Sequence, residues 1–191
     1  MRASLTDSAF TSLEFFLARR GECFSFASFS LMHSHPPYKI LILCNSNSAR
    51  SIFAEYLFRR KAGGRFELYS AGSNPAAGVH PITLQVLRED YGIDASDARS
   101  KSWKEFRGQH FDFIITVCDE AKEAAPTWPG QPIVAHWHSP DPLRFGGTPE
   151  QVRHFFFEVA AQIAHRIDLF CSLPDPKLDA LEVQLIGEKF R

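Results

Sequence analysis

The chain has 191 residues, of which 45% are hydrophobic and 23% are charged, and its formal net charge is −1. This composition is typical of one globular domain, and the near-zero charge gives no electrostatic reason to expect a nucleic-acid or membrane partner. No stretch is long and apolar enough for a membrane-spanning helix. Because the four cysteines do not form the framework of a small secreted protein, we expect a cytoplasmic protein with reduced thiols. We also expect a monomer. The cysteines are Cys23, Cys44, Cys118 and Cys171.

Residues 1–37 are unlike the rest of the chain, and we expect them to form an N-terminal extension before a single domain at residues 38–191. Charged side chains interrupt the apolar runs of the extension, which excludes the continuous apolar core of a signal peptide. Chain termini are commonly loose unless they dock on a domain, and Met32 is an alternative translation start. The extension is therefore predicted to be disordered or to result from an over-extended start.

Short apolar runs with the length of buried strands alternate with helical patterns along the rest of the chain. The predicted strands are residues 38–43, 66–70, 111–117 and 132–137. The predicted helices are residues 52–61, a helix from Pro81 to Tyr91, a long helix over residues 148–170 and a last helix from Asp175. Strands that alternate with helices predict an α/β fold, here a four-stranded parallel sheet flanked by helices on both faces.

The segment from Cys44 to Ser51 joins the first predicted strand to the first helix. Backbone N–H groups of such a loop can converge on one point, and the new helix adds the positive end of its dipole. Arg50 can complete a binding site for a tetrahedral oxyanion through a bidentate contact. The predicted oxyanion-binding residues are Asn45, Ser46, Asn47, Ser48, Ala49 and Arg50.

The same loop offers a nucleophile. Positive surroundings favour the thiolate form of Cys44, and Ser51 can donate a hydrogen bond to its sulfur. The alternative is a buried structural cysteine beside a serine that caps the helix. Cys118 follows the third predicted strand and Asp141 follows the fourth. Because ligands of parallel sheets bind beyond the carboxyl ends of the strands, we expect Cys44, Cys118 and Asp141 to lie at one edge.

Several motifs occur in the order and approximate spacing of a known family. They are Leu-Ile-Leu-Cys-Asn-Ser-Asn-Ser-Ala-Arg-Ser at 41–51, Tyr-Ser-Ala-Gly at 69–72, Arg-Ser-Lys-Ser-Trp at 99–103, Ile-Thr-Val-Cys-Asp at 115–119, His-Trp at 136–137 and Pro-Asp-Pro at 140–142. From about Tyr38 to Phe170 the chain resembles the low-molecular-weight tyrosine phosphatase family, in its thiol-dependent arsenate reductase branch. The resemblance implies a flavodoxin-like three-layer sandwich.

The resemblance also implies roles for the site residues. In the family's reductases, the counterpart of Cys44 forms an adduct with arsenate, and the counterpart of Cys118 attacks that sulfur, releases arsenite and leaves a disulfide. Asp141 matches the general acid, Arg50 binds the oxyanion together with the loop amides, and Ser51 supports the thiolate. Without these matches, Asp141 would be a turn residue and Cys118 a small apolar core residue.

Two other functions are compatible with these residues. A phosphatase acting on phosphotyrosine or other phosphomonoesters through a phosphocysteine needs only Cys44, Arg50 and Asp141. Against it, residues 143–145 lack the tyrosine pair that lines the phosphatase cleft in relatives. The second alternative is a non-catalytic module that binds oxyanions.

One departure from the family pattern concerns the reductant. Reductases relayed by thioredoxin carry a third cysteine seven residues beyond the second, where this chain has Ala125. Cys171 lies on a long apolar helix and is expected to be a core residue rather than a substitute. The resemblance therefore implies no bound cofactor and an external thiol reductant, which could be thioredoxin, glutathione with glutaredoxin, or a similar thiol.

Two further departures concern the loop and its support. Ser46 stands where the family usually has glycine, and a positive φ there would strain serine. Some relatives hold a potassium ion at positions matching Asn47, Glu55, Ser70 and Lys101, with an aspartate at the last of these. The ammonium of Lys101 can pair with Glu55 in place of the cation, so the prediction is that no metal binds.

Two His-x-His pairs, His33/His35 and His136/His138, have the side-chain type of a zinc site. Only a closed set of three or four ligands makes a convincing zinc site, and a His-x-His pair supplies two. His136 is expected to orient the crevice, and no zinc is predicted at either pair.

Overall fold

The computed structural model describes residues 36–178 and 180–188. Almost all of the predicted N-terminal extension lies outside these residues, and so do Cys23, Met32 and the pair His33/His35. The predicted domain, residues 38–191, is described apart from residue 179 and residues 189–191.

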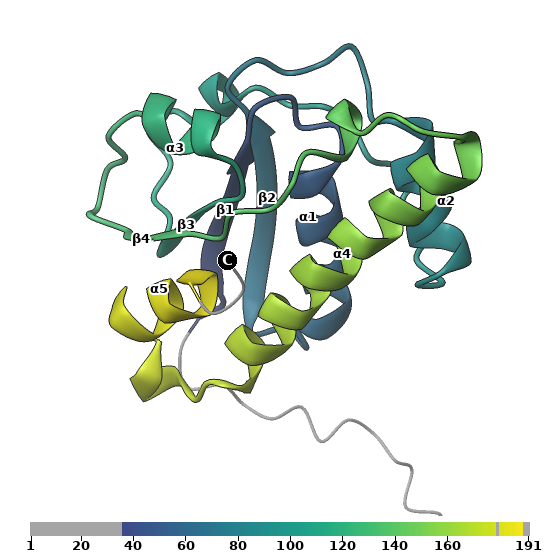
Figure 1. Ribbon diagram of the computed structural model, residues 1–191. Helices are drawn as coiled ribbons and strands as arrows, with labels where there is room; N and C mark the ends of the chain where they lie inside the picture. The colour runs from purple at the N-terminus through teal and green to yellow at the C-terminus, as the bar shows by residue number, and fades with distance from the viewer. Residues whose placement is uncertain (1–35, 179, 189–191) are drawn as a thin grey trace, which may run out of the picture. The chain divides into compact units, whose positions relative to one another are not determined.

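Four parallel strands form a single sheet (Figure 1). They are β1 (Tyr38–Cys44), β2 (Phe66–Gly72), β3 (Phe113–Thr116) and β4 (Ile133–His136), in the spatial order β2-β1-β3-β4. The predicted strands and the parallel sheet are confirmed. β3 is shorter than predicted, because Phe111 is buried by ring contacts with Tyr69 and Trp128 rather than by strand pairing.

The order of the strands decides where a ligand can bind. The chain passes from β1 to β2 on one side and then returns to β3 on the other side of β1. In such sheets the crevice lies outside the carboxyl ends of the strands at this switch point. Cys44 ends β1, and Cys118 lies two residues beyond β3, so both thiols lie at the carboxyl ends of adjacent strands.

Helices lie on both sides of the sheet in a three-layer α/β arrangement, with α1, α2 and α4 packed against one another (Figure 1). The α-helices of the described residues are α1 (Arg50–Lys61), α2 (Pro81–Glu89), α3 (Asp119–Ala124), α4 (Pro149–Ser172) and α5 (Ala180–Glu188). Short 3₁₀ helices occur as η1 (Trp103–Phe106), η2 (Pro142–Arg144) and η3 (Asp175–Lys177).

Two of these helices differ from the prediction. α3 was not predicted, because its six residues are too few for a helical period to be seen. The predicted last helix is confirmed as α5, but its predicted start at Asp175 is wrong, because only the 3₁₀ turn η3 forms there and α5 begins at Ala180. Leu178 separates the two with a ψ of 54°, which is outside the helical region.

α1 lies in the interior, and all of its residues from Arg50 to Phe58 are buried. It contacts both β1 and β2, and it packs on α4 through Phe53 and Phe156. The helix starts two residues before its predicted start, at Arg50, so Arg50 and Ser51 belong to its first turn. The first turn of a buried helix thus forms one wall of the crevice.

α5 packs closely against the edge strand β4. The indole Nε1 of Trp137 donates a hydrogen bond to the carbonyl of Val183 at 3.1 Å. A Cβ atom at Gly187 would lie 2.1 Å from the carbonyl oxygen of His136, so this contact requires glycine. The Trp137 ring also stacks on Phe58 of α1 with a centroid separation of 6.1 Å.

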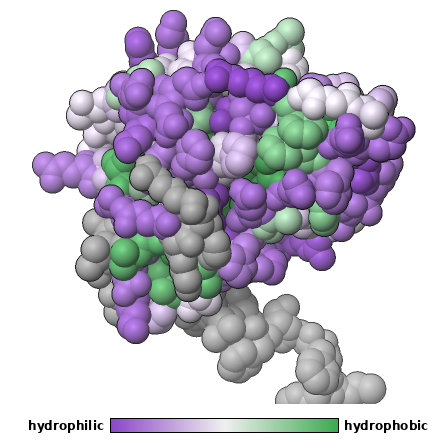
Figure 2. Space-filling view, viewed as in Figure 1, coloured by the Kyte–Doolittle hydropathy of each residue, from purple (hydrophilic) through white to green (hydrophobic). Residues whose placement is uncertain are grey.

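Hydrophilic residues cover most of the molecular face in Figure 2, and apolar residues form small patches between them. Among the described residues, the large hydrophobic side chains that are clearly exposed are Val134, Leu143, Phe145 and Leu185. Within the described ranges, no helix combines the length and the apolar character needed to cross a membrane.

Candidate active site

The loop between β1 and α1 is held from one side through its carbonyl groups. Those of residues 44, 45, 46 and 48 accept hydrogen bonds of 2.9–3.1 Å from backbone N–H groups within residues 73–80. In a trans peptide unit the carbonyl and the following N–H point in opposite directions, and no described peptide bond is cis. The N–H groups of residues 45, 46, 47 and 49 therefore point to the other side. This arrangement suits a tetrahedral oxyanion, as predicted for residues 45–50.

Cys44 is buried at the start of this loop, with 1% of its surface exposed. Its Sγ accepts a hydrogen bond from the N–H of Asn47 at 3.1 Å and lies 2.8 Å from Oγ of Ser51. Nδ2 of Asn47 donates to the same Ser51 oxygen at 2.8 Å, so the hydroxyl proton of Ser51 can point to the sulfur. Two donors directed at one sulfur stabilise a thiolate.

The residue with positive φ in the loop is Asn47, at 45°, and Ser46 is not among the described residues with positive φ. The strain considered for Ser46 therefore does not arise. Asparagine tolerates the left-handed region better than most side chains. Asn47 also braces the loop, since its Nδ2 donates to Oγ of Ser70 at 2.8 Å and its Oδ1 accepts from the N–H of Lys101 at 2.7 Å.

Glu55 lies beneath the loop with 2% of its side chain exposed. Its carboxylate accepts hydrogen bonds from Ser70, Arg59 and Lys101, and the Lys101 Nζ is 2.9 Å away. The ion pair between Lys101 and Glu55 is the one that the sequence suggested. An ammonium group of the chain itself thus neutralises the buried carboxylate.

Arg50 connects the loop to Asp141. Its guanidinium forms a 3.0 Å ion pair with Oδ2 of Asp141 and donates to the carbonyl of Ser139 at 3.2 Å. Asp141 is the N-cap residue of η2, and its Oδ1 accepts a hydrogen bond from the N–H of Leu143 at 3.1 Å. The structure thus brings together Arg50 and Asp141, which are far apart in the sequence, as the predicted common edge requires.

A second buried arginine supports the Asp141 loop from behind. Arg166 on α4 is fully buried, and its Nη1 donates to Oγ of Ser139 at 3.0 Å. Sequence reasoning missed both residues. The signal that could have found them is a charged residue inside the apolar stripe of α4, between the buried residues Ile163 and Ile167.

Cys118 is fully buried at the N-cap position of α3. Its strand is adjacent to that of Cys44, and the N–H of Val117 donates to the carbonyl of Leu43 at 2.8 Å. Burial raises the pKa of the Cys118 thiol to about 11, an effect that the nearby charge of Arg50 offsets only in part. In this position Cys118 is a protonated thiol at neutral pH.

The remaining described cysteine lies at the opposite end of the sheet. Cys171 is near the end of α4, and its carbonyl accepts from Arg65, which precedes β2. It is half-buried against the core, where burial raises its pKa to about 11. Its predicted packing role is confirmed. Ala125 ends α3, so the described residues place no third thiol beside Cys118.

His136 and His138 lie beside the start of α3. Nδ1 of His136 is 2.8 Å from Oγ1 of Thr116, and its Nε2 is 2.9 Å from Oδ1 of Asp119. Nδ1 of His138 is 3.3 Å from the same carboxylate oxygen. Burial lowers the pKa of His136. Sequence reasoning missed Asp119 as a partner of this pair, because the contact joins α3 to β4.

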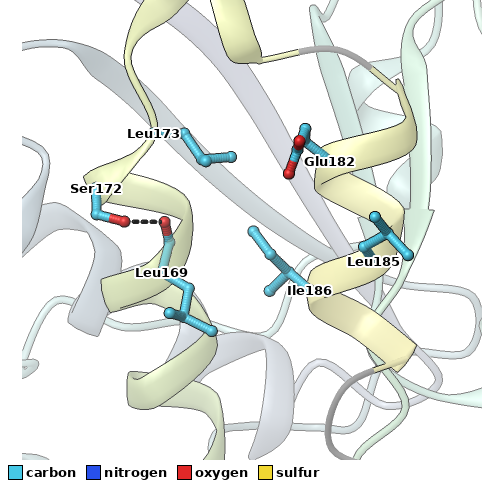
Figure 3. Close-up of a pocket in the computed structure, with 6 residues that line it drawn as sticks. All are labelled: Leu169, Ser172, Leu173, Glu182, Leu185 and Ile186. Carbon is cyan, nitrogen blue, oxygen red and sulfur yellow. Dashed lines mark hydrogen bonds between the residues drawn. The ribbon is translucent and has the colours of Figure 1, made fainter.

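A pocket of about 320 Å³ lies away from these residues, between the end of α4 and α5 (Figure 3). Apolar side chains predominate in its lining, with Glu182 at one side, and it contains none of the predicted site residues. It is lined by Leu169, Ser172, Leu173, Glu182, Leu185 and Ile186. The pocket therefore does not coincide with the loop between β1 and α1. We place the candidate active site at the loop, because its side chains can react with and bind an oxyanion.

Comparisons with known proteins agree with this geometry. Residues 39–173 match the family model described as low molecular weight phosphotyrosine protein phosphatase. An arsenate reductase of Halalkalibacterium halodurans is 34% identical over 131 residues, which are 69% of this chain and 93% of the relative. A glutaredoxin arsenate reductase of Synechocystis is 28% identical over 130 residues, 68% and 93% of the two chains. A solved arsenate reductase in the phosphate-binding state has a TM-score of 0.59 at 26% identity, covering 71% of this chain and 97% of that one.

Proposed function

Because the chain belongs to the low molecular weight phosphotyrosine protein phosphatase family, we propose from its site and its relatives that it is a thiol-dependent arsenate reductase. The observation that carries the proposal is the position of Cys118. It lies just beyond the end of β3, and β3 is adjacent to β1, the strand that ends at Cys44. Hydrolysis of a phosphoester needs one thiol. Reduction of arsenate needs two electrons, which a pair of thiols supplies when it forms a disulfide.

Arsenate is a tetrahedral oxyanion that fits the donors of the loop. The N–H groups of residues 45, 46, 47 and 49 and the first turn of α1 supply hydrogen bonds and the positive end of the helix dipole. Arg50, fixed by the carbonyl of Ser139, contributes charge and a planar pair of donors. Its ion pair with Asp141 supports the proposal that this residue acts beside the oxyanion site.

In the first step the Cys44 thiolate attacks arsenic. A sulfur–arsenic bond forms and one arsenic–oxygen bond breaks. Asp141, which has to be protonated in the reacting complex, donates the proton with which that oxygen leaves as water. The hydrogen bonds from Asn47 and Ser51 hold the thiolate before the attack. No electrons are transferred to arsenic until the next step.

In the second step the Cys118 thiolate attacks the sulfur of Cys44. A sulfur–sulfur bond forms and the sulfur–arsenic bond breaks with its electron pair remaining on arsenic, so arsenic(V) becomes arsenic(III) and arsenite leaves. The buried position of Cys118 keeps its thiol protonated, so we expect the start of α3 to move before the attack.

An external thiol then reduces the Cys44–Cys118 disulfide. The described residues hold no third cysteine beside Cys118, and Ala125 occupies the position at which a relay cysteine would stand. The reductant therefore has to reach the disulfide itself, or it enters earlier as a small thiol. Thioredoxin and glutathione with glutaredoxin are the candidates, and one relative is named a glutaredoxin arsenate reductase.

The test is arsenate-dependent disulfide formation. Fully reduced protein is incubated with arsenate or with phosphate, then digested and mapped by mass spectrometry. A Cys44–Cys118 crosslink that forms with arsenate and not with phosphate is the expected result. Absence of the crosslink, with a phosphomonoester still hydrolysed, would overturn the proposal in favour of a phosphatase, for which Cys44, Arg50 and Asp141 suffice.

A further inference from the structure

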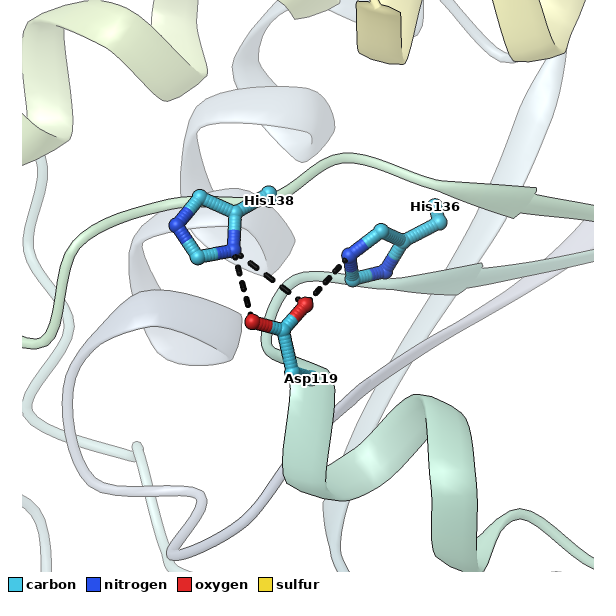
Figure 4. A group of neighbouring side chains, drawn as sticks. All are labelled: Asp119, His136 and His138. Carbon is cyan, nitrogen blue, oxygen red and sulfur yellow. Dashed lines mark hydrogen bonds and ion pairs between the residues drawn. The ribbon is translucent and has the colours of Figure 1, made fainter. Parts of the chain in front are cut away.

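Outside the oxyanion loop, the described residues bring three metal-ligating side chains together at the start of α3. Asp119 is the first residue of α3, and His136 and His138 stand at the end of β4 and just beyond it (Figure 4). Figure 4 shows both imidazole rings directed at one carboxylate. We propose that Asp119, His136 and His138 bind a divalent transition-metal ion of the zinc class, which fastens the start of α3 to β4.

The distances between the donor atoms support this site. Nε2 of His136 is 2.9 Å from Oδ1 of Asp119, and Nδ1 of His138 is 3.3 Å from both carboxylate oxygens. One donor atom from each of the three residues lies within 4.8 Å of the others. In tetrahedral zinc sites the bonds to nitrogen and oxygen are about 2.0–2.1 Å, which puts neighbouring donors about 3.3 Å apart. Small side-chain rotations therefore suffice to hold an ion.

The surroundings of His136 are those of a metal ligand. Metal-bound imidazoles use one nitrogen for the ion and commonly donate from the other to a protein oxygen. Nδ1 of His136 lies 2.8 Å from Oγ1 of Thr116, a buried residue of β3, and this leaves Nε2 for the ion. The side chain of His136 is 12% exposed, and those of His138 and Asp119 are 41% and 58% exposed, so an ion can enter from solvent.

The fold explains why these ligands meet. Residues two apart on an extended segment point to the same side, which places His136 and His138 together. The parallel pairing of β3 with β4 then brings the residue after Cys118 to the same place. A His-x-His pair alone supplies two ligands, and Asp119 adds the third. Three protein ligands leave a fourth position for water.

An ion at this place has a consequence that rests on the proposed function. Asp119 is covalently linked to Cys118, and the proposed second step includes a movement of the start of α3. A metal that ties Asp119 to β4 opposes this movement. Zinc should therefore slow arsenate-driven formation of the Cys44–Cys118 disulfide, although metal binding itself does not depend on any reaction with arsenate.

The experiment measures metal binding first. Cobalt(II), used as a probe with visible absorption bands, is titrated into full-length protein carrying Cys44→Ser and Cys118→Ser, so that thiolates at the active site do not contribute. Zinc is then measured by displacement of the cobalt. His136→Gln, His138→Gln and Asp119→Asn are compared with the control His154→Gln. His154 forms a pair of the same 3.3 Å length with Glu158 on α4, without a third ligand.

The expected result is one ion per chain with tetrahedral-type cobalt bands, at least about tenfold weaker in each ligand variant and unchanged in His154→Gln. Circular dichroism confirms that each variant is folded. Three results overturn the proposal: no binding, binding that survives loss of His136 and of His138, or cobalt spectra with sulfur charge-transfer bands. The effect of zinc on disulfide formation is measured in wild-type protein, which retains Cys44 and Cys118. If cobalt binds as expected but zinc does not slow disulfide formation, the metal site is supported and its influence on Cys118 is contradicted.

Discussion

Asn47 connects the thiol of Cys44 to parts of the chain that are distant in sequence. Its N–H contacts the sulfur, and its side chain bonds Ser51, Ser70 and the backbone of Lys101. Few side chains combine a tolerated positive φ with both a donor and an acceptor, and asparagine is one of them. The position of the Cys44 sulfur is thus coupled to β2 and to the segment before η1 through one residue.

The two active-site cysteines should respond differently to replacement. Cys44→Ser is expected to lower turnover by at least about 10³-fold with the fold intact, because a serine hydroxyl is not ionised at neutral pH. Cys118→Ser should abolish arsenate reduction and spare any hydrolysis of a phosphomonoester. Steady-state assays of both reactions on each variant test this. Arsenate reduction that persists in Cys118→Ser would contradict the role given to the second thiol.

Lys101 should stabilise the fold through its ion pair with the buried Glu55. Replacing it by methionine is expected to lower the unfolding free energy by about 2 kcal/mol, since a buried charge loses one partner and keeps only its bonds to Ser70 and Arg59. Urea denaturation measures the change.

The variant Lys101→Asp adds a carboxylate next to Glu55, and its unfolding free energy should rise with potassium but not with tetramethylammonium. Wild-type stability should be equal in the two salts.

At the scale of the elements, α2 depends on an unusual cap. His80 is its N-cap residue, and Nδ1 accepts a hydrogen bond from the N–H of Ile82 at 3.3 Å while the ring stacks on Phe156. Only the neutral imidazole can accept this bond. Burial lowers the pKa of His80, in agreement with a neutral ring. The backbone N–H of the same residue donates to Ser48, so the cap adjoins the oxyanion loop.

Stability should therefore fall on acidification through this histidine. The folded pKa lies below the ordinary value of 6.5, so the unfolded chain binds more protons near and below pH 6.5 and unfolding becomes easier. The difference in unfolding free energy between wild type and His80→Asn should change by about 1 kcal/mol between neutral pH and pH 5, because asparagine accepts at every pH. Urea denaturation at several pH values tests it. If the difference in unfolding free energy between the two proteins stayed constant with pH, the role of neutral His80 as the cap of α2 would be contradicted.

At the scale of the whole molecule, the family model begins at residue 39 and the described residues bury their own core. We predict that removing residues 1–32 leaves arsenate reduction and the unfolding midpoint unchanged. Both are measured side by side with the full chain. A drop in either would show that the N-terminal residues take part in the domain, against the boundary predicted at residue 38.

The sequence was informative where a local pattern decides the structure. The strand before Cys44 was recognisable because strands buried on both faces read as apolar runs, and the motifs gave Arg50, Cys118 and Asp141. The sequence was uninformative where a contact between distant elements determines which side chains meet. Asp119 meets His136 through the pairing of β3 with β4, and Arg166 meets Ser139 through the packing of α4. Neither contact leaves a periodic signal.

The close contact of α5 with β4 bears on how the protein is made. Domains fold from the N-terminal side as the ribosome releases them. β4 is synthesised before α5, so the surface of β4 and Trp137 that α5 contacts stays uncovered on the nascent chain until Gly187 has emerged. Apolar surface that is exposed during folding is a place where chains aggregate and chaperones bind. We therefore expect the loop that carries Asp141, which starts just after β4, to acquire its final position late in synthesis.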